Sequence, residues 1–395
     1  MNKLLKLIPY WFLIFTIGFG WFILAPAIPL LDIYLHTSTG NILILISSYG
    51  YTMAILGLLA GYFSAKLSVK SMLYTGMVIS FIGLLGRAFS PDYITFLFFG
   101  IIAAAAYPLV LAPIGSIMKS IDNERSETIS GVSFGFLFFG LAMGSLIGPD
   151  ISKFGVKTVL FMPVILAFIA MIFMLFVVKS YPTNYVKKIK GVFRPGMLKN
   201  WWVGLSIASV SVLFGSVAST VLHLHSLKNF IEFGGILGGL EFLGAAIGAI
   251  ILPYIFEKIN HVKLGNVFTG ILSLLSLSAL VYSLSFTRDE TMMLLSFFFF
   301  GFFGNAYWTM ALTSVTKYVS NPADAGFSTA MYSVFTNVGV SLIPIFVGVE
   351  FSSLKTIIIG VIIVLVIEII AAMMSPLILS GHTKLNENLN MASGK

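Results

Sequence analysis

The sequence predicts an all-α polytopic membrane protein, with twelve transmembrane helices arranged as two six-helix bundles related by pseudo-two-fold symmetry. Three observations support this prediction. Hydrophobic residues make up 58% of the 395 residues, charged residues only 10%, and the mean hydropathy is +1.00, whereas a soluble domain carries about 25% charged residues. Apolar stretches long enough to cross a bilayer recur along the chain. The two halves also share short patterns at a nearly constant offset.

The predicted spans are apolar stretches separated by short polar breaks. Their lengths exclude transmembrane β-strands, which run about 9–11 residues. The first stretch follows Lys3 and Lys6 as a signal peptide would, but its apolar part is too long and eleven spans follow, so we interpret it as an uncleaved helix. In order, the spans are 8–31, 41–63, 71–90, 93–118, 128–149, 157–178, 201–224, 233–256, 264–286, 292–316, 326–349 and 355–379.

Lysine and arginine gather on one side of these spans. If the N-terminus is cytoplasmic, 17 of the 23 basic residues fall in segments on the cytoplasmic side, so the positive-inside rule places both termini in the cytoplasm of a cell whose plasma membrane the chain crosses. The loop 179–200 holds six basic and no acidic residues. It divides the chain into a bundle at 1–180, a basic cytoplasmic linker at 181–199 that lies on anionic lipid, and a bundle at 200–395.

The net charge of +8 therefore reflects mostly the basic residues that orient the spans in the membrane, and we expect no nucleic-acid partner. The chain has no cysteine, which excludes disulfides, thiol chemistry and cysteine metal sites. It contains no H-E-x-x-H pattern, Ser/His/Asp set or glycine-rich phosphate loop, so we expect no metal, no cofactor and no catalysis, with a membrane-embedded enzyme as a remote alternative. His223 and His225 would not share a helical face, which argues against a metal pair.

Short patterns recur between the two halves. "SLIGP" in the fifth span is answered by "SLIP" in the eleventh, and "GYFSAK", with Tyr62 and Lys66, is answered by "PYIFEK", with Tyr254 and Lys258, at an offset of 192. The fourth and tenth spans share the order of "GIIAAAAY" and "GFFGNAY". Two related six-span halves are typical of secondary transporters, which hold the substrate between the halves near the bilayer midplane.

The whole chain resembles the major facilitator superfamily in its 12-helix form. The family's loop after the second span reads G-x-x-x-D-R/K-x-G-R-R/K, and "GYFSAKLSVK" keeps Gly61, Lys66 and Lys70 but has Ala65 at the Asp position. The fourth-span arginine of many proton antiporters is Phe96 here. The resemblance implies transport of a small-molecule substrate by alternating access in the lipid bilayer, and we expect a monomer.

The fifth-span pattern of the family's antiporters, G-x8-G-x3-G-P, is met by Gly135, Gly144, Gly148 and Pro149. Together with Gly140 these glycines also form a smooth helix face. Between helices in lipid, close approach through small residues supplies the packing. We therefore interpret the stretch as a tight helix interface that Pro149 relaxes at its outer end, with an antiporter role as the alternative.

Charged residues within the spans are the strongest indications of function, because burying each charge in lipid costs several kcal/mol unless the side chain faces protein or water. Glu241 shares a helix face with Gly234, Gly238, Ala245 and Gly248, so it points toward another helix. A carboxyl group in such a place can exchange a proton near neutral pH. We predict a proton-coupling site at Glu241, with an interhelical hydrogen bond as the alternative.

Two further intramembrane charges are harder to assign. Glu368 lies in the twelfth span, which is peripheral in the resembled fold, and we expect a structural role. Arg87 lies near the level of Asp32 and Asp150, so we predict an outer ion pair or an extracellular gate there.

In the resembled fold, helices 1, 4, 7 and 10 line the transport path. Their middles hold aromatic and weakly polar residues but no lysine or arginine, which an anionic phosphate ester would need. An aromatic, weakly polar cavity with one carboxylate favours a neutral or cationic organic solute. The candidate cavity residues are Trp21, Tyr107, Ser209, Ser216, Asn305, Tyr307 and Trp308.

These observations predict a secondary active transporter that moves a small neutral or cationic organic solute by alternating access, coupled to protons and working as an exporter. One alternative stays open. "GFGW" at 18–21 resembles the first-span signature of proton-linked monocarboxylate transporters, although Thr16 and Ile17 stand where that signature has an acidic residue and a glycine. Uptake of a monocarboxylate or another small organic acid is therefore the second function to consider.

Overall fold

The computed structural model of the chain describes residues 3–182, 186, 193–217, 230–287, 289–352 and 355–380. All regular elements of these residues are helices, and twelve helical segments are long and apolar enough to cross a membrane. The all-α, twelve-span fold class predicted from composition is thereby confirmed. It follows from chemistry, because a backbone in lipid must satisfy its polar groups internally and a helix does so within one segment.

The helices fall into two sequential sets. The first set is α1 (Ile8–Phe22), α2 (Ile28–Tyr34), α3 (Thr39–Lys66), α4 (Val69–Phe89), α5 (Tyr93–Leu111), α6 (Ile114–Ile121), α7 (Ser126–Ser152) and α8 (Val156–Val177). The second set is α9 (Leu198–Val217), α10 (Phe230–Lys258), α11 (Val262–Phe286), α12 (Glu290–Val315), α13 (Pro322–Gly348) and α14 (Ile357–Met374).

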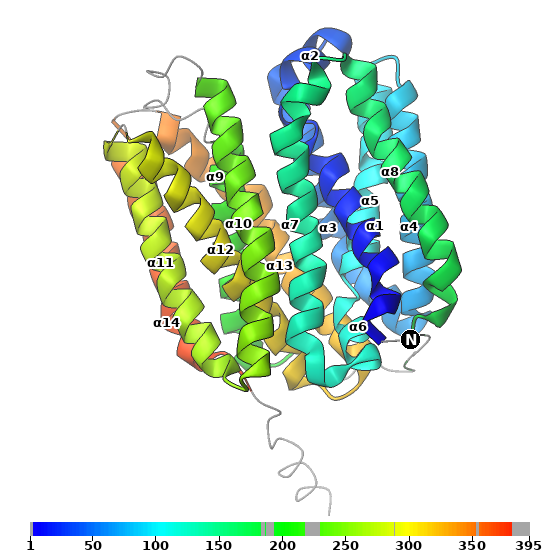
Figure 1. Cartoon of the computed structure of the whole chain (residues 1–395), viewed down its shortest axis with the longest axis vertical. Coiled ribbons are helices and arrows are strands. Elements are labelled where there is room, and N and C mark those ends of the chain that lie inside the picture. Colours follow the sequence, from blue (N-terminus) through cyan, green and yellow to red (C-terminus); the bar gives the residue numbers. More distant parts are fainter. Residues whose placement is uncertain are drawn as a thin grey trace, which may run out of the picture.

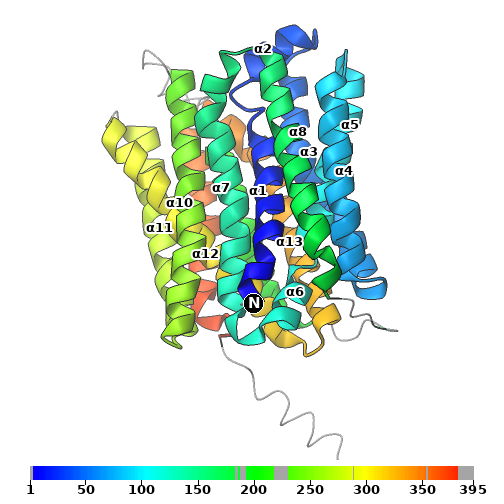
Figure 2. The ribbon, with the colours of Figure 1, turned by 45° about the vertical axis from the view of Figure 1, so that its right-hand side comes forward.

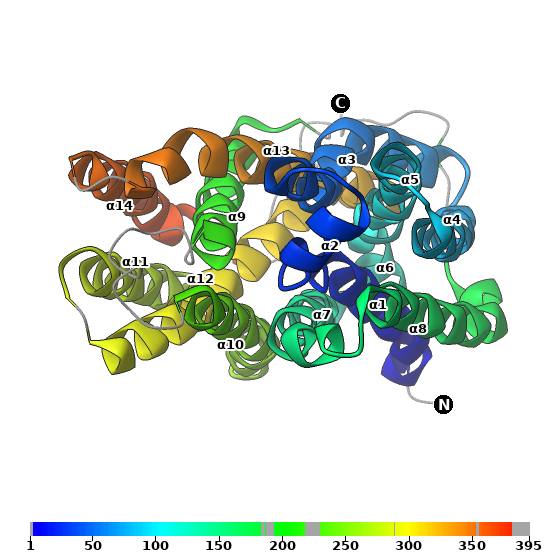
Figure 3. The ribbon, with the colours of Figure 1, turned by 90° about the horizontal axis from the view of Figure 1, so that it is seen from above.

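The two sets form two bundles that lie side by side, with α1–α8 on one side and α9–α14 on the other (Figure 1; seen from above in Figure 3). We call the end of the molecule that holds the N-terminus and α6 the terminal end, and the opposite end, where α2 lies, the far end (Figure 2). The bundles meet mainly where α7 packs on α10 and where α3 and α6 pack on α13.

Two of the expected continuous spans are interrupted. The predicted span 8–31 is divided because α1 ends at Phe22 and α2 begins at Ile28, and the intervening stretch contains Pro26. The predicted span 93–118 is divided between α5 and α6 beside Pro113. Proline lacks the N–H that the helix ladder needs and disfavours helical geometry in the residue before it, so both breaks follow from the sequence.

The glycine-rich stretch of α7 packs against α1. A Cβ added at Gly144 would come within 2.7 Å of the Ile23 backbone nitrogen and 3.0 Å of the Phe19 carbonyl oxygen, and one at Gly140 would meet the backbone of Phe15. Gly148 packs against Pro26, which lies in the stretch between α1 and α2. Only residues without a side chain permit this approach, which brings backbone against backbone.

The two ends of the glycine stretch differ from its middle. Gly135 faces the other bundle, where Ile250 of α10 covers it. Pro149 lies inside α7, which continues to Ser152. The stretch therefore contacts both α1 within its own bundle and α10 across the interface between bundles.

The repeated "GYFSAK" and "PYIFEK" patterns take the same local structure. The Lys66 ammonium lies 5.9 Å from the centroid of the Tyr62 ring at the end of α3. In the other bundle, the Lys258 ammonium lies 5.7 Å from the centroid of the Tyr254 ring at the end of α10. α3 and α10 are thus corresponding helices of the two bundles, and residues 192 positions apart can be compared directly.

Hydrogen bonds between the bundles are concentrated at the terminal end. The Gly115 N–H donates to the Thr329 hydroxyl over 3.1 Å, and the Lys119 ammonium donates to the carbonyl of Val319. The first N–H groups of α7 donate to the Glu257 carboxylate of α10. Toward the far end, the Ser145 hydroxyl donates to the carbonyl of Gly235 over 3.3 Å. The bonds at the terminal end hold the molecule closed there.

Candidate functional site

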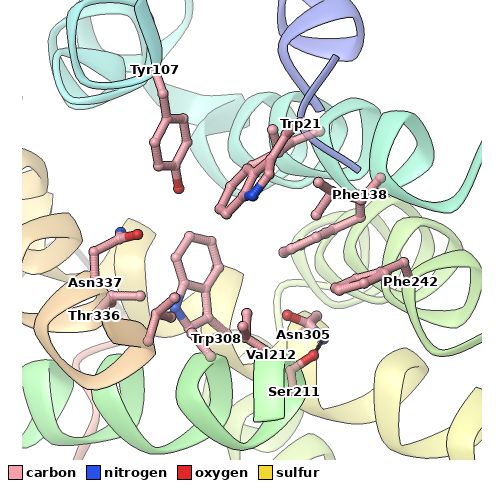
Figure 4. Close-up of a pocket in the computed structure, with 14 residues that line it drawn as sticks. Trp21, Tyr107, Phe138, Ser211, Val212, Phe242, Asn305, Trp308, Thr336 and Asn337 are labelled. Carbon is pink, nitrogen blue, oxygen red and sulfur yellow. Dashed lines mark hydrogen bonds between the residues drawn. The ribbon is translucent and has the colours of Figure 1, made fainter. Parts of the chain in front are cut away.

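A small cavity lies between the two bundles, near the middle of the long helices (Figure 4). Its volume of about 40 Å³ is enough for about three water molecules. Residues of both bundles line it, from α1, α5, α7, α9, α10, α12 and α13. They are Trp21, Tyr107, Leu137, Phe138, Leu141, Ala208, Ser211, Val212, Phe242, Asn305, Trp308, Thr336, Asn337 and Val340.

Aromatic contacts between the bundles close the cavity on two sides. Toward the far end, the rings of Phe22 and Phe242 meet edge to face, with centroids 4.7 Å apart. Toward the terminal end, the Phe134 ring meets the Trp308 ring in the same way at 4.5 Å. Each pair joins one residue of the first bundle to one of the second, so the cavity cannot open on either side without separating an aromatic pair.

Trp21 is fixed from behind. Its ring stacks on Tyr49 of α3, with centroids 4.9 Å apart and planes 9° from parallel, and its indole N–H donates to the Ile46 carbonyl over 2.7 Å. Because both its face and its N–H are occupied, Trp21 presents the cavity with an apolar ring edge. It serves as a rigid wall more than as a hydrogen-bonding group.

The polar groups of the cavity come from α5, α9, α12 and α13. The Asn305 amide donates to the Ser211 hydroxyl over 3.3 Å, and the Tyr107 hydroxyl lies beside the Asn337 amide. The Trp308 indole N–H and the Thr336 hydroxyl are buried and have no hydrogen-bond partner among the residues that the structure describes. These two groups are available to something that enters the cavity.

The other predicted cavity residues lie elsewhere. Tyr307 points into its own bundle, where its hydroxyl donates to the Ala371 carbonyl over 2.8 Å. Ser209 donates to the Leu205 carbonyl of its own helix. Neither lines the cavity. The side chain of Ser216 lies outside the described residues, as do His223 and His225.

Glu241 of α10 is fully buried beside the cavity and is not part of its lining. Neither of its carboxyl oxygens has a partner with hydrogen-bond geometry among the described residues. Ser211, which does line the cavity, is the polar side chain whose hydroxyl interacts with this carboxyl group. Because Ser211 also accepts the bond from Asn305, one hydroxyl separates the buried carboxyl from the cavity.

Glu368 of α14 is also fully buried, within the second bundle. One carboxyl oxygen accepts a hydrogen bond of 2.6 Å from Ser273 of α11, and the other accepts one of 3.0 Å from Ser206 of α9. The carboxyl group therefore ties three helices together. Since α9 lines the cavity with its opposite side, Glu368 supports the cavity wall from behind.

Two of the outer charged residues, Arg87 and Asp150, make separate contacts. Asp150 is exposed and pairs with Lys153 three residues later, at 2.6 Å. Arg87 is 1% exposed, and its guanidinium donates to the Gly20 carbonyl over 2.9 Å and lies over the Phe96 ring. Arg87 and Asp150 are thus not paired with each other, and an outer ion pair or extracellular gate that involves Asp32 stays a prediction. Asp32 is half-buried on α2.

The residues of the second-span loop pattern lie at the terminal end. Gly61 packs against Phe327 of α13, in the other bundle. Lys66 ends α3, and the backbone N–H of Lys70 donates to the Pro182 carbonyl over 3.3 Å. Among the described residues, no three histidine, aspartate or glutamate side chains gather as a metal site would require.

The sequence analysis missed several lining residues because it considered only helices 1, 4, 7 and 10. Phe138, Phe242, Thr336 and Asn337 come from the fifth, eighth and eleventh spans. A signal for two of them was present, since Thr336 and Asn337 are adjacent polar residues near the middle of the eleventh span. Ser211 was missed because the helical phase that separates it from Ser209 depends on how α9 packs.

Comparison with known proteins agrees with this architecture. The family model described as Major Facilitator Superfamily matches residues 10–289. The chain is similar to the crystal structure of a bacterial homologue of the iron transporter ferroportin in an outward-facing state, with a TM-score of 0.69, 13% sequence identity, and coverage of 95% of this chain and 98% of that chain. A search of curated proteins gives no match. Since the family model covers more than half of the sequence, the chain is a multi-pass membrane protein that belongs to the Major Facilitator Superfamily.

Proposed function

We propose that this protein is a proton-coupled secondary transporter of the plasma membrane that carries a small neutral or cationic organic solute. It works as a monomer with both termini in the cytoplasm. Export is the direction favoured by the partial antiporter pattern of Gly135, Gly144, Gly148 and Pro149. The solute occupies the cavity between the bundles and reaches each side in turn as the bundles rock.

The position of Glu241 is the observation that carries proton coupling. An ionised carboxylate that is buried without a cation or hydrogen-bond donors costs several kcal/mol, so the proposal gives Glu241 a proton in this conformation. Ser211 and Asn305 connect the carboxyl group to the cavity. When the bundles separate, water reaches Glu241 along these side chains and the proton leaves. Loading and release then alternate with opening, as coupling requires.

The cavity lining supports the choice of solute. The described residues that form it include no lysine or arginine, and a carboxylate solute would need such a partner when it leaves water. Monocarboxylate uptake is therefore less well supported than transport of a neutral or cationic solute. The terminal end, where the bundles are joined by hydrogen bonds, is the cytoplasmic side in this proposal, because most basic residues fall there.

Substitution of Glu241 by glutamine tests the proposal. A thermal-stability screen of the purified protein against sugars, amino acids, organic acids and lipophilic cations first identifies a bound solute. In proteoliposomes, we expect E241Q to lose accumulation of that solute driven by a pH gradient and to keep exchange of labelled for unlabelled solute. E290Q, which changes an exposed carboxylate, is the control. Accumulation by E241Q equal to that of the unchanged protein would refute the assignment.

A second readout needs no solute. The carbonyl stretch of a protonated carboxyl group appears in infrared spectra and is separate from that of a carboxylate. We expect one such band in the purified protein that disappears in E241Q. A spectrum in which E241Q retains every protonated-carboxyl band would show that Glu241 is ionised in this conformation.

A further inference from the structure

The Trp308 side chain carries an unused hydrogen-bond donor into the cavity. Trp308 is 4% exposed, and its indole nitrogen has no hydrogen-bond partner in the described part of the chain. Figure 4 shows this nitrogen on the same side of the cavity as Thr336 and Asn337. Buried polar groups are almost always paired, and an indole N–H can only donate. The Trp308 N–H therefore needs a hydrogen-bond acceptor, and none of the described residues supplies one.

Thr336, which is 3% exposed and whose hydroxyl has no partner among the described residues, lines the same side of the cavity (Figure 4). The Tyr107 hydroxyl approaches that wall from α5 (Figure 4). Donor groups are thus gathered on the side formed by α5, α12 and α13. The opposite wall carries the rings of Phe138 and Phe242. The cavity has one polar side and one flat apolar side.

We propose that this cavity binds an uncharged, planar organic solute that presents a carbonyl oxygen or an unprotonated ring nitrogen to the Trp308 N–H. The proposal rests on the proposed function in taking the cavity as the transport site, and it narrows the solute class stated there. An ammonium solute brings only N–H donors, which cannot pair with an indole N–H. A carboxylate solute would meet no basic side chain in the described lining.

The planar shape follows from the aromatic contacts. Trp308 is held edge to face by Phe134 at 4.5 Å, and Phe138 lies 6.1 Å from Trp308 between centroids. The present cavity of about 40 Å³ holds only water, so a solute enters when the bundles separate and these rings part. A flat solute ring can then take the place of one aromatic partner of Trp308. It covers the ring surface that becomes exposed when the bundles separate.

The test uses four planar bicyclic probes of similar size. They are coumarin, which is neutral and carries a carbonyl acceptor, naphthalene, which has no acceptor, N-methylquinolinium, a cation, and 2-naphthoate, an anion. Equilibrium binding to the detergent-purified full chain is measured by thermophoresis. One neutral hydrogen bond is worth about 1 kcal/mol, so we expect coumarin to bind about fivefold to tenfold more tightly than naphthalene. We expect the two ions to bind more weakly than coumarin.

The variant W308F removes the N–H and keeps an aromatic ring. We expect it to lower coumarin affinity about fivefold to tenfold and to leave naphthalene affinity nearly unchanged. The matched control is W201F, because Trp201 also has a buried indole N–H without a partner among the described residues but does not line the cavity. We expect W201F to bind both probes as the unchanged protein does.

Several outcomes would overturn the proposal: no binding of coumarin, equal binding of coumarin and naphthalene, tighter binding of either ion, or a coumarin preference that survives in W308F. Binding in detergent does not depend on a proton gradient. Loss of pH-driven transport in E241Q therefore tests the proposed function separately, and either proposal can fail without the other.

Discussion

The Lys317 ammonium lies 2.7 Å from the Glu127 carboxylate, and this ion pair joins the second bundle to the first. Both side chains are largely buried, at 12% and 3% exposure. The pair lies at the terminal end, beside the Glu257 carboxylate. Glu257 accepts hydrogen bonds of 2.8 Å from the Glu127 N–H and 3.0 Å from the Thr128 N–H, the first amides of α7. An acidic group at a helix N-terminus satisfies amides that have no partner within the helix.

Of the two corresponding helix ends, that of α10 carries a carboxylate at this position and that of α3 does not. Glu257 lies 192 residues after Ala65, the position where the resembled family has an aspartate. The equivalence of α3 and α10, shown by their matching Lys–Tyr contacts, makes the comparison direct. The carboxylate that is absent from the end of α3 is therefore present at the end of α10, where it holds α7.

Neutralising Glu257 is expected to open the terminal end. Hydrogen bonds to a charged group contribute about 1.5–3 kcal/mol, so E257Q should raise the population open at that end at least about tenfold. The chain has no cysteine, so S116C provides a single reporter. Ser116 is 1% exposed and packs against Gly326 of the other bundle. We expect a hydrophilic maleimide to label S116C about tenfold faster when E257Q is added.

K317M should act in the same direction, because it leaves Glu127 without its partner. The control is K258M, which removes a neighbouring charge that lies over the Tyr254 ring of its own helix. Equal labelling of S116C with and without E257Q would show that Glu257 does not hold the bundles together.

Glu368 is expected to stabilise the second bundle through its two serine bonds. E368A removes both acceptors and leaves the Ser206 and Ser273 hydroxyls buried, which should cost about 2–4 kcal/mol and lower the melting temperature of the purified protein. E368Q keeps the volume and can bond to both serines, so most of the loss should be recovered. A melting temperature for E368Q as low as that of E368A would instead indicate that the role of Glu368 requires its charge.

The packing of α7 on α1 predicts that even one methyl group at Gly144 is harmful. G144A places a Cβ 2.7 Å from the Ile23 nitrogen, and backbone atoms cannot move aside as a flexible side chain can. We expect a destabilisation of about 1–3 kcal/mol, read as a lower melting temperature. G235A is the control, because a Cβ there would meet nothing within 4 Å. Equal melting temperatures for G144A and G235A would show that α7 does not pack closely on α1 at Gly144.

Arg87 and Asp150 are expected to differ in their contribution to stability. R87M removes the donor to the Gly20 carbonyl and should lower stability by about 1–3 kcal/mol. D150N disrupts a pair whose side chains are 74% and 73% exposed, so its effect should be within about 0.5 kcal/mol. Thermal unfolding of the two variants checks this order. A large effect of D150N would indicate a contact of Asp150 beyond Lys153.

Much of the fold could be predicted because the bilayer imposes simple rules. Length and apolar composition located the twelve spans, and the offset of 192 identified corresponding ends of α3 and α10. The breaks at Pro26 and Pro113 were also encoded locally, but the apolar stretches around them are long enough to be mistaken for continuous spans.

The candidate site was predicted less completely, because a cavity depends on how helices rotate against each other. Trp21, Tyr107, Asn305 and Trp308 line it as expected. Tyr307, adjacent to Trp308, points the opposite way into its own bundle. A pattern in one helix shows which residues share a face, and only the packing of the neighbouring helices decides which face meets the cavity.

The two aromatic pairs, Phe22 with Phe242 and Phe134 with Trp308, bear on the electrical behaviour of the membrane. A continuous file of water through the protein would let protons run down their gradient and would dissipate the membrane potential. One ring pair lies on each side of the cavity. When the rings of one pair separate, the other pair stays in contact and interrupts the file of water. A carrier built in this way can expose its interior to both compartments in turn without ever becoming a channel.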